Sequence, residues 1–140
     1  MAHTYTELFY HFAWATKDRA LMITPELEPH LYRYLRHRCE EMRVMVHAAD
    51  GMPDHVHVAC TLPVTLSIAE FIGKLKGASS HFINHGEHGW AQEGRFDWQP
   101  GYGALTFAKR DLAAIVRYIQ RQKEHHREGT LSEKMERWEE

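Results

Sequence analysis

Apolar positions recur along the chain with two periods, and each period predicts one kind of secondary structure. Strict alternation predicts half-buried strands, most clearly over residues 55–60. Runs rich in aromatic and β-branched residues predict further strands. The pattern places strands over residues 4–14, 44–49, 55–60 and 104–108. Because a short turn at residues 51–54 separates the middle two, we expect them to form an antiparallel hairpin.

Apolar residues spaced three and four apart predict the helices. Thr24 followed by Pro25 is a typical helix start, since threonine caps well and proline suits the first helical position. Gly73 and Gly77 lie inside the second predicted helix, where each costs about 1 kcal/mol relative to alanine. Helices are expected over residues 25–43, 67–83 and 111–127, with a short polar helix over 131–138.

The order strand, helix, strand, strand, helix, strand, helix is typical of a split βαβ, or ferredoxin-like, fold. We therefore expect an α+β protein with an antiparallel sheet, helices packed on one face and an added C-terminal helix. The 140 residues contain neither a repeat nor a low-complexity linker. They are interpreted as one domain, in which residues 128–140 form a polar C-terminal extension.

The composition narrows the function classes. Hydrophobic residues make up 44% of the chain and charged residues 26%, which excludes a collagen, a disordered tail and a coiled-coil rod. The net charge of −2 excludes a strongly basic nucleic-acid protein, although a local basic patch remains open. The two cysteines, Cys39 and Cys60, are expected to be reduced thiols. Without a secretory signal or a long apolar stretch, we expect a cytoplasmic protein with no membrane contact.

Twelve histidines are an unusual number, and two of them occupy an informative position. His55 and His57 share one face of a predicted strand, because successive side chains point to opposite faces. Val56, Val58 and Cys60 point to the other face, so Cys60 is a poor candidate for a third ligand. Two imidazoles two residues apart can bind one divalent metal. The alternative is a pair of exposed or hydrogen-bonded histidines on a sheet surface.

A second pair lies on the last predicted helix. Tyr118 and Gln122 are four residues apart and therefore share a helix face, which His125 extends. Tyrosine has a pKa near 10, so its attack on a phosphodiester requires polarisation of the phosphate, which a metal can supply. Together with the histidine pair, Gln122 as an oxygen ligand and Tyr118 as nucleophile suit phosphodiester cleavage. The alternative is a packing tyrosine beside a solvated glutamine.

Basic and aromatic residues give weaker indications of nucleic-acid binding. Lys74 and Lys76, with the hydroxyls of Ser79 and Ser80, form the best candidate patch for DNA phosphates. Arg117 and Arg121 on the last helix are further candidates, the alternative being solvated helix faces. Trp90, Trp98 and Tyr102 could stack on unpaired bases, although such residues are more often core or turn anchors. The acidic residues 133–140 are expected to stay away from DNA.

These features resemble a known family. Residues 54–58 resemble the His-hydrophobic-His strand of HUH single-strand DNA endonucleases. More closely, the chain resembles the single-tyrosine, IS200-like transposases of bacterial insertion sequences and their domesticated REP-associated relatives. The resemblance covers roughly residues 5–127. The segments that carry it are 11–19 in the first strand, 75–80 in the second helix, 96–104 before the last strand and 118–126 in the catalytic helix.

The resemblance implies a function. It assigns His55, His57 and Gln122 to a divalent metal, Mg²⁺ or Mn²⁺, and Tyr118 to nucleophilic attack that forms a 5′-phosphotyrosine bond and a free 3′-OH. It also implies a single-stranded DNA substrate with a hairpin, a homodimer and no nucleotide cofactor. Two departures are Arg121, where the family often has asparagine, and Ala20, where it often has proline.

Two other functions stay open from the sequence. One is a ferredoxin-like module that binds nucleic acid on its sheet without chemistry, although His55 and His57 stand where stacking rings would be expected. The other is a metal-dependent phosphodiesterase for a small molecule, with water as the nucleophile. The first would bind DNA without cutting it, and the second would release product without a protein-bound intermediate.

Overall fold

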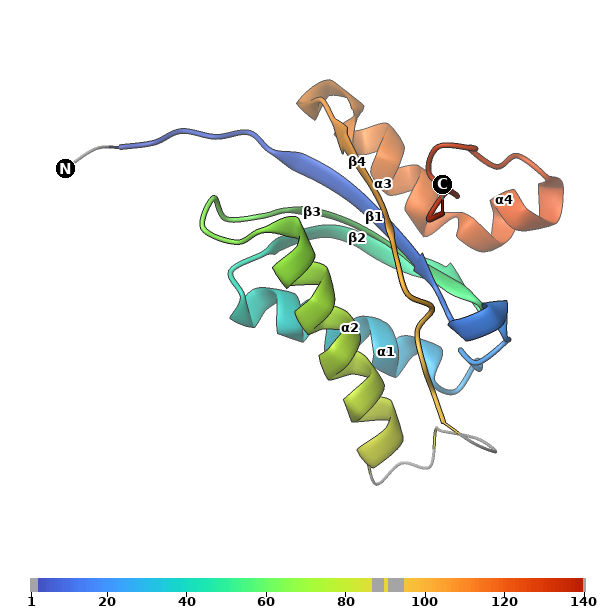
Figure 1. The fold of residues 1–140 in the computed structure, drawn as a ribbon. Coiled ribbons are helices and arrows are strands. Elements are labelled where there is room, and N and C mark those ends of the chain that lie inside the picture. Colours follow the sequence, from blue (N-terminus) through green and yellow to red (C-terminus); the bar gives the residue numbers. More distant parts are fainter. Residues whose placement is uncertain (1–2, 87–89, 91–94, 140) are drawn as a thin grey trace.

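The protein is described by a computed structural model that covers residues 3–86, 90 and 95–139. Four strands form one antiparallel sheet in the order β2-β3-β1-β4. Figure 1 shows α1 and α2 on one side of this sheet and α3, α4 and the C-terminus on the other. The strands are β1 (Phe9–Ala15), β2 (Met45–Met52), β3 (His55–Thr61) and β4 (Gly103–Phe107); the helices are α1 (Glu28–Glu41), α2 (Ile68–His85), α3 (Leu112–Gln120) and α4 (Gln122–Glu128). The ferredoxin-like prediction is confirmed, with the added helices on the face opposite α1 and α2.

The main core lies between the sheet and the helices α1 and α2. Phe12 and Trp14 of β1 point into it beside Val56 and Val58 of β3, as the alternation of these strands predicts. Both free cysteines are buried in the same cluster. Helices α1 and α2 contribute Leu31, Leu35, Phe71, Ile72 and Leu75.

Replacing Phe12 with alanine should lower the free energy of unfolding by about 3–5 kcal/mol. The ring has no exposed surface, and it packs against Phe71 with 5.5 Å between ring centroids, so its removal leaves a cavity in the core. Urea unfolding followed by circular dichroism measures the effect. Tyr5→Ala is the control, because Tyr5 is 81% exposed and should change the stability little. A loss below 1 kcal/mol for Phe12→Ala would contradict this packing.

The opposite face of the sheet is built mainly from small side chains and histidine. Antiparallel pairing places Ala13 beside His57, and Ala15 beside His55. Helix α3 packs here through Ile119, which contacts Ala48 and other small residues of the sheet. Because alanines leave space above the strands, side chains from α3, α4 and the chain end can approach the two histidines.

Several predicted boundaries differ from the structure. Residues 4–8 are not part of the sheet, because pairing of β1 begins only where Phe9 meets Phe107. Residues 25–27 form a turn, and α1 starts at Glu28; the Thr24 hydroxyl accepts a hydrogen bond from the Leu27 N–H within that turn. Strand β2 continues to Met52, through part of the predicted turn. The sequence also predicts a loop over residues 85–92, and most of these residues lie outside the described part of the chain.

The last predicted helix, residues 111–127, is two helices. Arg121 leaves the helical conformation, with φ −109° and ψ 28°, and so separates α3 from α4. After α4 the chain turns at Gly129, whose φ of 72° is the left-handed conformation that ends many helices. Residues 130–139, here called the C-terminal segment, contain one turn and no helix, so the predicted helix over 131–138 is wrong. The side chains of Glu136 and Trp138 instead contact residues of the sheet.

Within the described part of the chain, none of the helices combines the length and the apolar character needed to cross a membrane.

Candidate functional site

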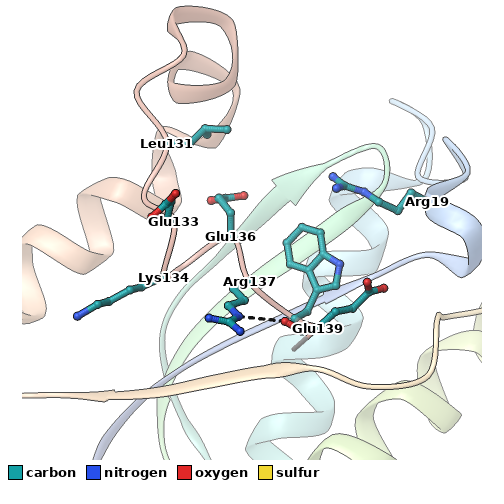
Figure 2. A pocket seen from close by; sticks show the side chains of 8 residues that line it. Arg19, Leu131, Glu133, Lys134, Glu136, Arg137 and Glu139 are labelled. Atoms are coloured by element: carbon teal, nitrogen blue, oxygen red, sulfur yellow. Dashed lines mark hydrogen bonds between the residues drawn. The ribbon is translucent and has the colours of Figure 1, made fainter.

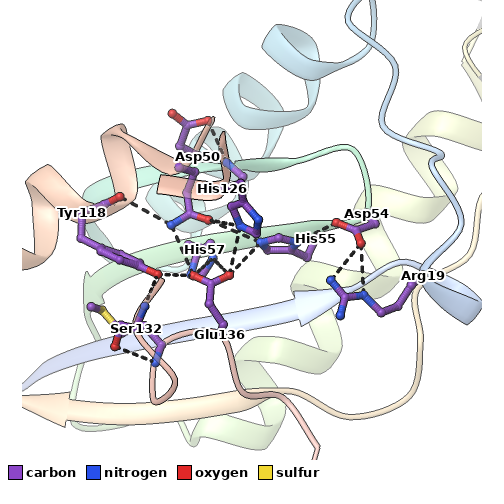
Figure 3. A network of polar contacts seen from close by, with 12 residues as sticks. Arg19, Asp50, Asp54, His55, His57, Tyr118, His126, Ser132 and Glu136 are labelled. Atoms are coloured by element: carbon purple, nitrogen blue, oxygen red, sulfur yellow. Dashed lines mark hydrogen bonds and ion pairs between the residues drawn. The ribbon is translucent and has the colours of Figure 1, made fainter. Parts of the chain in front are cut away.

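The two histidines of β3 lie at the centre of a buried polar cluster on the alanine-lined face of the sheet. Neither side chain has exposed surface. Both Nε2 atoms face the carboxylate of Glu136, at 3.1 Å for His55 and 3.2 Å for His57 (Figure 3). The prediction that both side chains share a face, with Val56 and Val58 on the other, is confirmed.

The outer nitrogen of His55 is held by an acidic partner. Its Nδ1 lies 2.7 Å from the Asp54 carboxylate, which in turn accepts hydrogen bonds from Arg19 at 2.9 and 3.1 Å. Burial tends to raise the pKa of Asp54, but His55 and then Arg19 outweigh it and lower the pKa to about 2. Burial tends to lower the pKa of His55, but its bonds to Asp54 and Glu136 outweigh it and raise the pKa. This arrangement keeps a proton on Nδ1 and turns Nε2 towards the site.

His57 has a different outer partner, the buried His11 of β1. The Nδ1 of His57 and the Nε2 of His11 are 2.9 Å apart. Burial, and then the neighbouring His57, lower the pKa of His11 to about 3, so this ring is neutral at neutral pH and can accept a hydrogen bond. Burial also lowers the pKa of His57. When His57 donates from Nδ1 to His11, its Nε2 can coordinate a metal in the place where Glu136 lies in this structure.

Tyr118 and Gln122 come together beside the histidines, as predicted, although the helix break lies between them. Gln122 is fully buried, and its Oε1 lies 3.4 Å from the Nε2 of His55. The Tyr118 hydroxyl donates a 2.6 Å hydrogen bond to Glu136 and accepts one of 2.9 Å from the Ser132 N–H. Burial, and then the bond to Glu136, raise the pKa of Tyr118 to about 12.

Glu136 is the residue on which the cluster converges. Besides both histidines and Tyr118, its carboxylate lies 3.3 Å from the Nε2 of His126. Burial tends to raise the pKa of Glu136, but hydrogen bonds from His55 and His57 outweigh it and hold the pKa well below its usual range. Ligand atoms of His55, His57 and Glu136 all lie within 4.8 Å of one another, so the three could hold a metal ion. Imidazole and oxygen donors in one site fit a transition metal such as Mn²⁺ better than Mg²⁺.

The predicted DNA-contacting residues are divided between the two sides of the molecule. Arg117 and Arg121 are exposed on the side of the histidines, at the end of α3. The other four lie on α2, across the sheet, and already have protein partners: Lys74 bonds Glu70, Lys76 donates to the carbonyls of Gln99 and Gly101, and Ser80 donates to Gly77. Ser79 is completely buried and leaves no surface for a phosphate.

Of the aromatic candidates for base stacking, Trp98 is a core residue. It is 9% exposed and its Nε1–H donates to the Ser79 hydroxyl. Trp90 and Tyr102 are half-buried against the same core. Trp98 is therefore a core anchor, and the positions of the three aromatic residues do not support base stacking.

Sequence reasoning missed several residues of the cluster, among them His11 and Glu136. His11 sits on a strand whose alternation was visible, but its contact with His57 follows only from the register of β1 against β3. Glu136 was assigned to an acidic tail, and that prediction gave it no place in the site. Its position depends on the path of the chain after Gly129: the glycine after a basic last turn signals a helix end, but not the direction in which the chain continues.

The ferredoxin-like sheet, with a histidine pair on a central strand and a tyrosine and a glutamine above it, matches the class that the sequence resembles. The family model described as "Transposase IS200 like" matches residues 4–122. The chain therefore belongs to the IS200-like transposases, which are enzymes of DNA transposition and recombination.

Known relatives agree with this membership. The transposase for insertion sequence element IS200 of Salmonella typhimurium (strain LT2) is 31% identical over 131 residues, covering 92% of this chain and 86% of that protein. The ISDra2 transposase TnpA of Deinococcus radiodurans is 30% identical over 118 residues, covering 83% and 84%.

Two solved structures share the fold. A crystal structure from Deinococcus radiodurans R1, described as that of a transposase, has a TM-score of 0.62 and 28% identity, and the match covers 87% of this chain and 96% of that chain. A REP-associated tyrosine transposase bound to a REP hairpin also has a TM-score of 0.62, with 16% identity and coverage of 94% and 76%.

Proposed function

We propose that this transposase cleaves and rejoins single-stranded DNA through Tyr118, at sites marked by a DNA hairpin. The observation that supports the proposal best is that the proposed nucleophile and two proposed metal ligands all contact one carboxylate. The hydroxyl of Tyr118 and the Nε2 atoms of His55 and His57 all contact the Glu136 carboxylate. A DNA phosphate in that place would meet a nucleophile and a set of metal ligands together.

His55, His57 and Gln122 would hold the divalent metal, Mn²⁺ or Mg²⁺. When bound, the metal supplies positive charge that polarises the phosphate. The protein orients the ligands from behind, because Asp54 and His11 engage the outer nitrogens and leave Nε2 free to coordinate. Since the pKa of His55 is raised, a proton competes with the metal for this imidazole, and metal affinity should increase with pH.

In the cleavage step, the Tyr118 oxygen attacks the phosphorus while the bond from phosphorus to the 3′ oxygen breaks. The proton that leaves Tyr118 is balanced by the proton that the 3′ oxygen gains. The products are a 5′-phosphotyrosine bond and a free 3′-OH. A 3′-OH from another DNA end reverses the reaction and joins the strands, so neither water nor a nucleotide cofactor is required.

The hairpin and the assembly are parts of the same proposal. The REP-associated structure is described as bound to a REP hairpin, which supports a hairpin substrate here. Arg117 and Arg121 are exposed beside the site and suit contacts to phosphates of the strand. Lys74, Lys76 and Ser80, on the other side of the sheet, would serve a more distant part of the DNA. We propose a homodimer that acts in the cytoplasm.

A covalent adduct tests the function. Purified protein would be mixed with labelled single strands from both flanks of its own gene, with Mn²⁺ or with a chelator, and run on a denaturing gel. A labelled protein band that requires the metal is the expected result. Binding of hairpin strands without an adduct would favour the non-catalytic module. Cleaved product without bound protein would favour a hydrolase that uses water.

Replacing His11 with alanine should weaken Mn²⁺ binding about 10- to 100-fold, the usual effect of losing a partner behind a metal-bound histidine. His57 would lose the acceptor for its Nδ1–H and with it the fixed position of the proton. Isothermal titration calorimetry measures the affinity, and His11→Gln, which keeps an acceptor oxygen, should lose less. An affinity equal to wild type in a folded His11→Ala protein would show that His11 does not orient His57.

A further inference from the structure

The C-terminal segment covers the site from the side opposite the sheet. Its start is fixed by the turn at Gly129, and Thr130 donates from its N–H to the carbonyl of His125. Both hydrogen bonds of the Tyr118 hydroxyl go to this segment, one to Glu136 and one from the Ser132 N–H. The proposed nucleophile is therefore fully engaged by residues that follow the catalytic helices.

Trp138 continues this cover beyond Glu136. Its ring is 9% exposed and packs on Ala13 and Ala15 of β1. The ring centroid lies 4.9 Å from that of His55, and the Arg19 guanidinium carbon lies 4.8 Å from the Trp138 ring centroid. A flat ring above an imidazole and beside a guanidinium is the environment in which proteins stack a nucleobase. An open pocket of about 800 Å³ lies between Arg19 and the segment (Figure 2).

We propose that the C-terminal segment is a built-in occupant of the single-stranded DNA site: Glu136 takes the place of the scissile phosphate, and Trp138 that of a flanking base. This inference rests on the proposed function and adds its regulation. It also assigns a base-binding subsite formed by Ala13, Ala15, Arg19 and His55. DNA has to displace the segment before Tyr118 can act.

Segment and DNA exclude each other for a simple reason. The Glu136 carboxylate lies directly in front of the Nε2 atoms of His55 and His57, in the space that the metal and the phosphate beside it would fill. The Tyr118 oxygen already lies 2.6 Å from a Glu136 oxygen, which leaves no room for a phosphorus atom at bonding approach. A buried site with one set of such partners holds one anion at a time.

The segment can leave without disrupting the sheet. It follows the last helix, and its internal backbone bonding is slight, with one hydrogen bond from the Glu136 N–H to the Ser132 carbonyl. It crosses β4 at Gly103, so closely that a Cβ there would overlap the carbonyl oxygen of Arg137. Gly103 therefore admits the segment, and a side chain at this position would push it away without altering any proposed ligand.

Three variants of the full chain test the displacement: Glu136→Ala, Trp138→Ala and Gly103→Ala. Each removes or disturbs a contact of the segment, so the DNA concentration for half-maximal adduct formation should fall about 10-fold for Glu136→Ala, the effect of losing a hydrogen bond to a charged group. For Trp138→Ala and Gly103→Ala the rate at saturating DNA should stay near wild type, because DNA and the segment compete. Hydrogen exchange at the Ser132 amide should accelerate when DNA binds, since its bond to Tyr118 is broken.

Two matched controls make the same chemical changes at other positions. Glu133→Ala removes an exposed carboxylate of the same segment, and Gly77→Ala adds a methyl group where nothing lies within 4 Å. Both should behave as wild type. Unchanged half-maximal DNA concentrations in all three test variants, or lost cleavage in Glu136→Ala, would overturn the proposal. Absence of any adduct in wild type would instead reject the proposed function, so the two failures are distinguishable.

Abasic strands test the base subsite. In the Trp138→Ala protein, the space that the indole ring fills in wild type is open to a DNA base. An abasic nucleotide at one of the two positions that flank the cut should therefore weaken binding about 10-fold relative to the intact strand. Equal binding of strands that are abasic at either position would show that no base occupies this place, and would remove the subsite from the proposal.

Discussion

Tyr118→Phe should abolish formation of the covalent protein–DNA adduct, with a loss of at least about 10⁴-fold, as expected when a nucleophile is removed. Phenylalanine keeps the ring that stacks on His125, at 4.5 Å between centroids, and removes only the oxygen that would attack phosphorus. The adduct on a denaturing gel, in the presence of Mn²⁺, measures the effect. DNA binding should be retained or become tighter, because the segment loses its bonds to the Tyr118 oxygen.

The control for this variant is Tyr34→Phe, which removes a hydroxyl on α1, across the sheet from the site. Its adduct yield should equal that of wild type. A Tyr118→Phe protein that still formed the adduct would show that another side chain is the nucleophile. Mn²⁺ affinity should change little, because Tyr118 contributes no proposed ligand, and this separates loss of the nucleophile from loss of the metal.

His57→Ala should weaken Mn²⁺ binding more than about 100-fold, beyond the range seen when only an outer partner is lost. The variant removes one of two imidazoles whose Nε2 atoms face the same position, and it also leaves His11 without its bond. The adduct should fall in parallel at low Mn²⁺ concentration. Calorimetric titration with Mn²⁺ gives the affinity directly, independently of DNA.

His47→Ala is the matched control, since His47 lies on the neighbouring strand β2 and bonds Thr61, away from the cluster. It should bind Mn²⁺ as wild type does. Circular dichroism checks that His57→Ala is folded, because loss of a buried hydrogen-bonded side chain costs about 1–3 kcal/mol. Wild-type affinity in a folded His57→Ala protein would exclude His57 as a ligand.

The order of elements could be predicted because each leaves a local pattern. Alternation over residues 55–60 marks β3, and apolar residues at helical spacing mark α1 and α2. The ends of elements were less predictable, because they depend on partners. Strand β1 begins where β4 can pair with it, and the break at Arg121 follows no visible signal in the sequence.

The same distinction holds for the residues of the site: pairs with local spacing could be predicted, and contacts between distant segments could not. His55 and His57 could be predicted as a pair because both sit on one strand with a fixed period. Tyr118 and Gln122 were predicted as a pair from helical spacing, and they remain neighbours although the break at Arg121 places them on α3 and α4. That the two pairs meet follows from the packing of α3 on the sheet, for which the resemblance to transposases was the guide. Glu136 could not be predicted, because its contacts depend on how the chain end returns after α4.

The strands β1 and β3 carry the fold on one face and the chemistry on the other. Phe12 and Trp14 hold the core, whereas His11, Ala13 and Ala15 underlie the site. Even-numbered positions of this seven-residue strand therefore pack in the core, and odd-numbered positions from His11 to Ala15 face the site. Substitutions in the first set would change the stability of the core, and substitutions in the second set would change the site, with little interference between the two. A small domain thereby gains two nearly independent routes of adaptation within a single stretch of backbone.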